Sequence, residues 1–203
     1  MDTLQEIAAA SLSLAASVHD GHYEGVIVSG GSSQLSRSLF TSAWMAQYPE
    51  EPLPKIYILD ARANEMLYKA DVGLEQSKIW VQHWIDEKVP ALNDLKKERL
   101  CFIDDFSATG IKVNSVKEAF KELGFSRVDS HVFAASEEAE LDKQVFVAAH
   151  DDELVRALQS MSMNIRGEPS IEEILNRIES TGEERRLKVL EQLKEIGRKA
   201  RGR

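Results

Sequence analysis

Short apolar runs separated by helical patterns constrain the fold of this chain more than any other sequence feature. Three such runs, at residues 25–29, 55–59 and 100–103, are brief and rich in β-branched or aromatic residues, and helical spacing of apolar residues follows each one. Strands that alternate with helices are joined by right-handed crossovers, which produces a largely parallel sheet. The runs lack apolar–polar alternation, as strands covered on both faces do. The sequence therefore predicts an α/β fold: a largely parallel sheet with helices on both faces.

Patterns before and after these runs complete the predicted order. Apolar residues at helical spacing between Leu4 and Val18 predict an N-terminal helix that ends near Gly21. Apolar runs at 128–135 and 144–149 predict two further strands. Each run could instead be a buried piece of helix, but their brevity and β-branched content favour strands. Further helices are predicted at residues 35–43, 74–88 and 113–123.

After about residue 160, helical patterns replace strand patterns. Capping boxes begin at Ser170 and at Thr181, and each precedes an apolar helical stripe. We therefore expect an α/β domain at residues 1–160 and a helical C-terminal appendix at residues 161–203. Because the stripes need a partner, the appendix is predicted to be an assembly or regulatory element, with a homodimer as one candidate assembly. Packing back onto the same chain is the alternative.

Composition and charge argue against several classes of protein. A net charge of -9 over 203 residues argues against a nucleic-acid or anionic-membrane partner. Cys101 is the only cysteine, which rules out an intrachain disulfide and is consistent with a buried residue in a reducing compartment. Asp2 and Glu6 replace the positive start of a signal peptide, and no apolar run is long enough to span a bilayer. We expect a cytoplasmic protein without a membrane partner.

Two adjacent carboxylates, Asp104 and Asp105, follow the apolar run at 100–103. Ligands of parallel sheets bind where strands end, and two neighbouring carboxylates repel each other unless a polyol or a metal-bearing ligand gives both a partner. The small residues that follow, and the helix after them, offer backbone N–H groups and a positive dipole end, which suit a phosphate. A simple turn into a helix is the alternative, because Asp and Ser are favoured there. We expect both carboxylates to be solvated without ligand, and neither to neutralise a buried partner.

The string IDDFSATG at residues 103–110 resembles the ribose-phosphate signature of type I phosphoribosyltransferases, in which an apolar strand is followed by two acidic residues and, three positions on, by a small residue, Thr and Gly. The resemblance covers roughly residues 23–135 and implies that fold. It implies that Asp104 and Asp105 contact the ribose hydroxyls of phosphoribosyl pyrophosphate and serve catalysis, while the loop wraps the 5-phosphate. The ribose-phosphate residues implied in this way are Asp104, Asp105, Ser107, Ala108, Thr109, Gly110, Ile111 and Lys112.

The same resemblance implies a pyrophosphate loop after the first strand and a catalytic hood after the second. Paired glycines would let the backbone approach the ligand closely, although they could equally serve only to make a turn. Mg²⁺ is implied as an ion carried by the substrate, and its protein ligands cannot be read from the sequence. The implied pyrophosphate residues are Ser29, Gly30, Gly31 and Ser32. The hood candidates are Arg62, Lys69 and Lys78, for each of which a solvated surface position is the alternative.

Two positions depart from the family pattern. Lys112 stands where a small hydroxyl residue is common, and Ser29 stands where a basic residue is common. Lys112 either adds positive charge to the phosphate site or marks a relative that has altered its chemistry. The leading hypothesis is a phosphoribosyltransferase that transfers the phosphoribosyl group to a nitrogenous acceptor and releases pyrophosphate. The rival is a non-catalytic sensor of a nucleotide or of phosphoribosyl pyrophosphate on the same fold.

Overall fold

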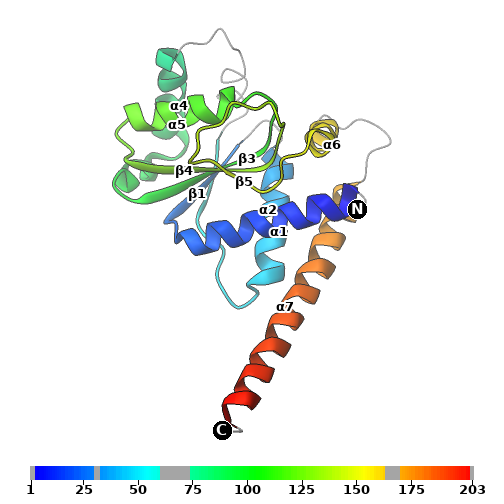
Figure 1. Cartoon of the computed structure of the whole chain (residues 1–203). Helices are drawn as coiled ribbons and strands as arrows, with labels where there is room; N and C mark the ends of the chain where they lie inside the picture. Colours follow the sequence, from blue (N-terminus) through cyan, green and yellow to red (C-terminus); the bar gives the residue numbers. More distant parts are fainter. Residues whose placement is uncertain (1–2, 30–32, 60–73, 163–169, 202–203) are drawn as a thin grey trace.

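The strands form one parallel sheet, which confirms the predicted fold class (Figure 1). The structure is a computed structural model and describes residues 3–29, 33–59, 74–162 and 170–201. Within these residues the sheet has five strands in the order β2-β1-β3-β4-β5. The strands are β1 (Gly25–Val28), β2 (Ile56–Ile58), β3 (Arg99–Ser107), β4 (Arg127–Ala135) and β5 (Phe146–Val147).

Helices cover both faces of this sheet. The side chains of each strand alternate between two apolar clusters, so that Cys101 and Ile103 pack on one face while Leu100 and Phe102 pack on the other. Helices α1, α2, α6 and α7 pack on the first face, and α4 and α5 on the second. The helices are α1 (Thr3–Gly21), α2 (Ser33–Gln47), α4 (Leu74–Lys88), α5 (Ile111–Glu122), α6 (Asp152–Ser162) and α7 (Ile171–Arg201), with a 3₁₀ helix, η1, at Pro90–Leu95.

The strand order creates one switch point in the sheet. Strand β1 lies between β2 and β3. After β1 the chain enters α2 on one face, and after β3 it enters α5 on the opposite face. In open parallel sheets, ligands bind outside the carboxyl ends of the strands at such a point. The carboxyl ends of β1 and β3 are therefore the place to look for a site.

Strand β3 is longer than the sequence pattern predicts, and it includes both aspartates. The predicted run ends at Ile103, whereas the pairing with β4 continues through Asp104 and Phe106 to Ser107. Strand β4 extends to Ala135 and offers backbone partners over this whole length. Backbone pairing does not depend on side-chain polarity, so the apolar run alone underestimates the strand.

Helix α6 is an element that the sequence analysis missed. Its first turn is capped by Asp151, whose carboxylate accepts hydrogen bonds from the backbone N–H groups of Glu153 and Leu154, at 2.7 and 2.9 Å. Leu154 and Leu158 are buried in the core at helical spacing. The Asp cap and this spacing were the available signal. The helix begins inside the predicted α/β domain and ends just beyond its predicted boundary at residue 160.

Helix α7 is a single helix, where two capping boxes had predicted two helical starts. The first box is confirmed, because the Ser170 N–H donates to the Glu173 carboxylate at 2.7 Å and the Glu173 N–H donates to the Ser170 hydroxyl at 3.2 Å. The second prediction is wrong, because Thr181 lies inside the helix. Next to it, Gly182 packs so closely that a methyl group there would overlap Ala46 of α2. Tertiary packing therefore overrides the local capping signal.

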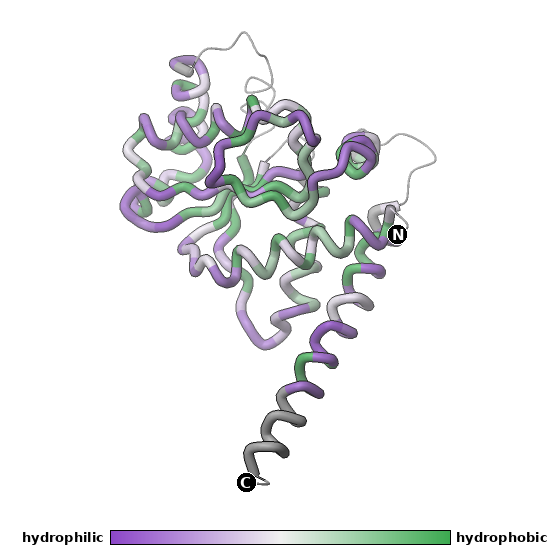
Figure 2. Tube along the Cα trace, viewed as in Figure 1, coloured by the Kyte–Doolittle hydropathy of each residue, from purple (hydrophilic) through white to green (hydrophobic). Residues whose placement is uncertain are grey.

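The two halves of α7 have different surroundings. Ile174 and Ile178 are fully buried in the cluster under α1 and α2. Beyond Gly182 the helix extends away from the body, and it is largely hydrophilic there (Figures 1 and 2). Leu187 and Val189 are half-exposed in this projecting part. The domain boundary near residue 160 stays a prediction, although the first half of α7 contributes to the main core. In the described part of the chain, no helix has the length and apolar character to cross a membrane.

Candidate functional site

The two aspartates lie at the carboxyl end of β3, beside the switch point, and they point to opposite faces. Asp104 pairs in register with Val132, which belongs to the cluster under α4 and α5. Because side chains alternate along a strand, Asp104 faces α5 and Asp105 faces the side of α1 and α2. Both residues are fully buried. Joint contact of both carboxylates with one ribose stays a prediction.

A buried cation holds Asp104. The Lys112 ammonium, in the first turn of α5, donates to Asp104 Oδ1 at 2.6 Å and to the Ser29 hydroxyl, at the end of β1, at 2.5 Å. The side chains of Asp104 and Lys112 are 1% and 6% exposed, and Ser29 is fully buried. Lys112 thus links the ends of β1 and β3 across the switch point.

The carboxylate environment differs from the sequence-based expectation. Solvated carboxylates with no buried partner were expected. The expected solvation is wrong for both Asp104 and Asp105, and Asp104 also has a buried partner. The sequence places Lys112 eight positions further on, so α5 brings its long side chain back over the strand end, where burial favours an ion pair. Asp104 Oδ1 also accepts the Asp105 backbone N–H at 3.1 Å. Asp104 Oδ2 is buried and has no hydrogen-bond partner among the described residues.

The loop between β3 and α5 is compact and partly exposed. The Ser107 hydroxyl accepts the Gly110 N–H at 3.1 Å, and the Thr109 backbone carbonyl accepts the Glu140 N–H at 3.2 Å. Gly110 has a φ of 84°, and a methyl group there would overlap the Glu140 carbonyl. Ala108 and Thr109 are exposed. The loop is therefore held in one shape while its tip stays accessible.

Helix α5 begins at this loop without a side-chain cap. Its N-cap is Gly110, which has no side chain, and the one side-chain contact given for the first turn is long: the Thr109 hydroxyl accepts the Ile111 N–H at 3.4 Å. Ile111, the first residue of the helix, is exposed. The first turn of a helix carries N–H groups that the helix itself cannot satisfy, together with the positive end of the dipole. This terminus is thus suited to an anion.

The other predicted site residues are only partly described. Ser29 lies at the switch point, bonded to Lys112, whereas Gly30, Gly31 and Ser32 lie outside the described residues. Arg62 and Lys69 also lie outside them. Lys78 lies on α4, where its ammonium pairs with Glu75 at 3.2 Å in an i,i+3 surface contact. The structure brings together Ser29, Asp104 and Lys112, and leaves the hood untested.

A divalent cation does not fit at Asp104 Oδ1, because the Lys112 ammonium already lies 2.6 Å away in a buried position. Mg²⁺ binds oxygen ligands at about 2.0–2.1 Å and usually keeps several of its waters. Among the described residues, no group of three or more His, Cys, Asp or Glu side chains is placed to hold a metal ion. Magnesium remains an ion that a diphosphate ligand would carry.

A second polar network, which the sequence analysis did not identify, joins β3, the middle of β4 and helix α1. His131 Nδ1 lies 3.2 Å from Cys101 Sγ, and His131 Nε2 lies 3.0 Å from the Ser17 hydroxyl. Burial lowers the pKa of His131 to about 4, so the imidazole is neutral at pH 7. Burial also raises the pKa of the Cys101 thiol well above its usual value. A neutral imidazole and an un-ionised thiol indicate a structural role.

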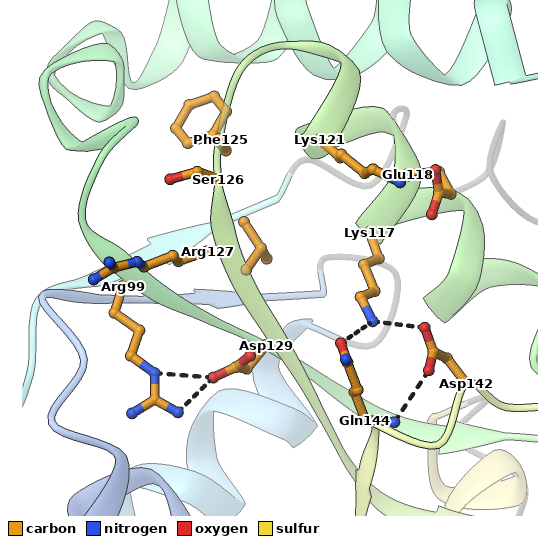
Figure 3. A pocket seen from close by; sticks show the side chains of 11 residues that line it. Arg99, Lys117, Glu118, Lys121, Phe125, Ser126, Arg127, Asp129, Asp142 and Gln144 are labelled. Atoms are coloured by element: carbon orange, nitrogen blue, oxygen red, sulfur yellow. Dashed lines mark hydrogen bonds and ion pairs between the residues drawn. The ribbon is translucent and has the colours of Figure 1, made fainter.

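A surface cavity of about 360 Å³ lies where β3 and β4 begin (Figure 3). Its lining is strongly charged, but its cations are largely paired. Arg99 donates to Asp129 at 2.8 and 3.1 Å, and Lys117 donates to Asp142 at 2.8 Å. The Lys117 hydrogen bond holds the pKa of the Asp142 carboxyl below its usual value. One pair joins β3 to β4, and the other joins α5 to the segment between β4 and β5, so both have a structural explanation.

Comparison with known proteins gives similarities in structure only. No protein-family model matches the chain, and no curated protein matches it. Among solved structures, the chain is similar to a purine phosphoribosyltransferase from Pyrococcus horikoshii, with 16% identity, a TM-score of 0.46, and coverage of 72% of this chain and 83% of that one. It is also similar to a hypoxanthine-guanine-xanthine phosphoribosyltransferase, with 8% identity, a TM-score of 0.47, and coverage of 73% and 75%.

A third similar structure is a phosphoheptose isomerase from Francisella tularensis, with 10% identity, a TM-score of 0.42, and coverage of 86% of this chain and 85% of that one. With TM-scores below 0.5, none of these similarities supports a conclusion about activity. The fold assignment rests on the strand order and connections of the chain itself.

Proposed function

We propose that this chain binds phosphoribosyl pyrophosphate, or a related ribose 5-phosphate ligand, at the switch point between β1 and β3. The observation that carries the proposal is the geometry of the β3–α5 connection. An acidic strand end leads through a fixed and accessible loop into a helix whose N-terminus has no side-chain cap. Acids suit hydroxyl groups and the helix terminus suits a phosphate, so the connection matches both ends of a ribose 5-phosphate.

The reaction proposed for this site is transfer of the phosphoribosyl group to a nitrogenous acceptor, with release of pyrophosphate. The backbone of residues 107–112 would hold the 5-phosphate, and Asp105 and the free oxygen of Asp104 would accept hydroxyl hydrogens. Orienting the ribose in this way would fix the anomeric carbon as positive charge develops on the sugar. Magnesium would neutralise the departing diphosphate as part of the substrate. No side-chain nucleophile is needed.

A second candidate function is that of a sensor, which binds the ligand but does not catalyse transfer. One observation favours it. The Lys112 ammonium neutralises Asp104, which leaves less negative charge next to the ribose than two free carboxylates would provide. Charge that stabilises a developing cation is what transfer chemistry requires, whereas a binding protein can dispense with it. The α7 helix, which projects from the body, would offer a route for such a protein to contact others.

Pyrophosphate release separates the two candidates. The protein is incubated with phosphoribosyl pyrophosphate, magnesium and a panel of nucleobases, and released pyrophosphate is measured. Turnover with any base supports the transferase. Saturable binding in a calorimeter without turnover supports the sensor, and the absence of both binding and turnover contradicts the proposed function.

An Asp105→Asn variant tests the role of the acidic strand end. A charge-assisted hydrogen bond contributes about 1.5–3 kcal/mol, so its loss should weaken ligand binding roughly ten- to a hundredfold. Asp142→Asn is the matched control, because Asp142 is an ion-paired aspartate that is not among the proposed site residues. Equal affinity of both variants and the parent would remove Asp105 from the site.

A further inference from the structure

The ammonium of Lys112 occupies the position at Asp104 where a ligand-bound cation or hydroxyl would otherwise bind. It lies 2.6 Å from Oδ1 and 2.5 Å from the Ser29 hydroxyl, and all three side chains are more than nine-tenths buried. Ser29 directly follows β1, Asp104 lies in β3 and Lys112 lies in α5, so the cation is held between three separate parts of the fold. A surface lysine that happened to approach an acid would not be enclosed in this way.

Charge accounting at the strand end shows what this cation does. Asp104 and Asp105 alone would place two negative charges next to each other in a buried position, where like charges strongly disfavour joint ionisation. Lys112 places one positive charge directly against Asp104. A divalent cation can provide the same compensation, but only by displacing the ammonium. The site is therefore already compensated before any ligand arrives.

One acceptor remains for a ligand on Asp104. Oδ1 is used by Lys112 and by the Asp105 N–H, while Oδ2 is buried and has no hydrogen-bond partner among the described residues. A buried carboxylate oxygen without a donor is costly, so a donor brought by a ligand would be favourable there. A sugar hydroxyl provides such a donor and carries no charge, whereas a metal ion would add charge to a compensated pair.

We infer that Lys112 serves as a built-in cation at Asp104, so that this chain binds a 5-phosphorylated ribose without a divalent cation at that carboxylate. The inference rests on the proposed function and specifies its ligand class: the recognised unit is the ribose 5-monophosphate moiety. Lys112 acts here as a positioning residue, through Asp104. Any magnesium dependence is then confined to ligands that carry a diphosphate of their own.

Calorimetric titration with ribose 5-phosphate tests the inference, because this probe has the phosphate and hydroxyls but no diphosphate. The full-length parent protein is titrated in buffer with EDTA and again with excess magnesium chloride. The inference predicts that the two dissociation constants agree within about threefold. Binding that appears only with magnesium overturns the inference and leaves the proposed function standing. Absence of ribose 5-phosphate binding in both buffers also overturns the inference, and the titration with phosphoribosyl pyrophosphate and magnesium then decides separately whether the proposed function stands.

Variants at Lys112 extend the same titration. Lys112→Thr removes the cation and opens space at Asp104, so its affinity in EDTA should fall by at least about tenfold and recover in part with magnesium. Lys112→Met has a similar length and no charge, so it should bind weakly in both buffers. Melting curves identify variants that do not fold. The parent titration decides the inference in either case, and unchanged affinity of a folded Lys112→Met protein in EDTA also overturns it.

Discussion

Replacement of Asp104 by Asn should destabilise the unliganded protein strongly, which is opposite to what a solvated carboxylate would give. At 2.6 Å and an effective dielectric constant of about 20, the attraction between the Lys112 and Asp104 charges is about 6 kcal/mol. Part of this attraction offsets the cost of burying two ions, so the net value of the pair is much smaller. Removing one partner is different, because the Lys112 ammonium then stays buried without this carboxylate. Such losses are about 3–5 kcal/mol.

The expected change in melting temperature follows from the size of the chain. For 150–250 residues, 1 kcal/mol corresponds to roughly 2–4 °C, so Asp104→Asn should lower the melting temperature by about 6–20 °C.

A double-mutant cycle isolates the pair. Lys112→Met should also destabilise the protein, because Asp104 would then be the uncompensated charge, whereas Asp104→Asn combined with Lys112→Met removes both charges and should recover most of the stability. The matched control is Asp142→Asn, which breaks the more exposed pair with Lys117 on the same helix and should cost less than about 1 kcal/mol. If Asp104→Asn melts with the parent, the Lys112 ammonium is not buried against Asp104, and the reasoning about the site is refuted.

Three further predictions concern the rest of the fold. Burial lowers the pKa of His131 to about 4, so between pH 4 and 6.5 this residue binds fewer protons in the folded state than in the unfolded state, and stability should fall by up to about 3 kcal/mol as the pH drops through that window. Urea unfolding measured at several pH values tests this, and His131→Gln should flatten the dependence. Gly110→Ala should melt well below Gly124→Ala, because both glycines have positive φ but only a methyl group at Gly110 would overlap the Glu140 carbonyl; equal melting temperatures would contradict the account of the loop. Deleting residues 184–203 should leave the melting temperature nearly unchanged, whereas deletion from residue 170 onward removes two buried isoleucines of α7 and should destabilise the core by several kcal/mol. Sedimentation of the parent and of the shorter deletion tests whether the projecting half of α7 forms a homodimer, and a monomeric parent would contradict that prediction.

Periodicity in the sequence was sufficient to predict the architecture of the sheet. Brief apolar runs such as 25–29 and 100–103 are buried strands, and the stripes between them are helices on opposite faces. The bounds of helix α4 agree with the prediction at both ends. Interactions between distant elements could not be predicted. The extension of β3 to Ser107 depends on the length of its partner β4, and the continuation of α7 through Thr181 depends on packing against α1 and α2.

The candidate site could be located from the sequence, but its electrostatics could not. Adjacent carboxylates after a strand indicated the correct edge of the sheet, and the small residues that follow indicated the loop. The position of the Lys112 ammonium depends on how α5 crosses the strand end, and on the Ser29 hydroxyl, which lies 83 positions away in the chain. Sequence spacing suggested that Lys112 would face the phosphate, whereas the structure places its ammonium against Asp104 and Ser29.

The most direct test of the central claim is a map of where a ligand binds. Backbone amide resonances of the protein are assigned by NMR and followed during titration with phosphoribosyl pyrophosphate and magnesium. The account predicts saturable shifts concentrated at residues 107–113 and at Ser29, because the loop, the start of α5 and the end of β1 surround the proposed site. Shifts concentrated instead around Arg99 and Asp129, at the opposite edge of the sheet, or no saturable shifts at all, would contradict it.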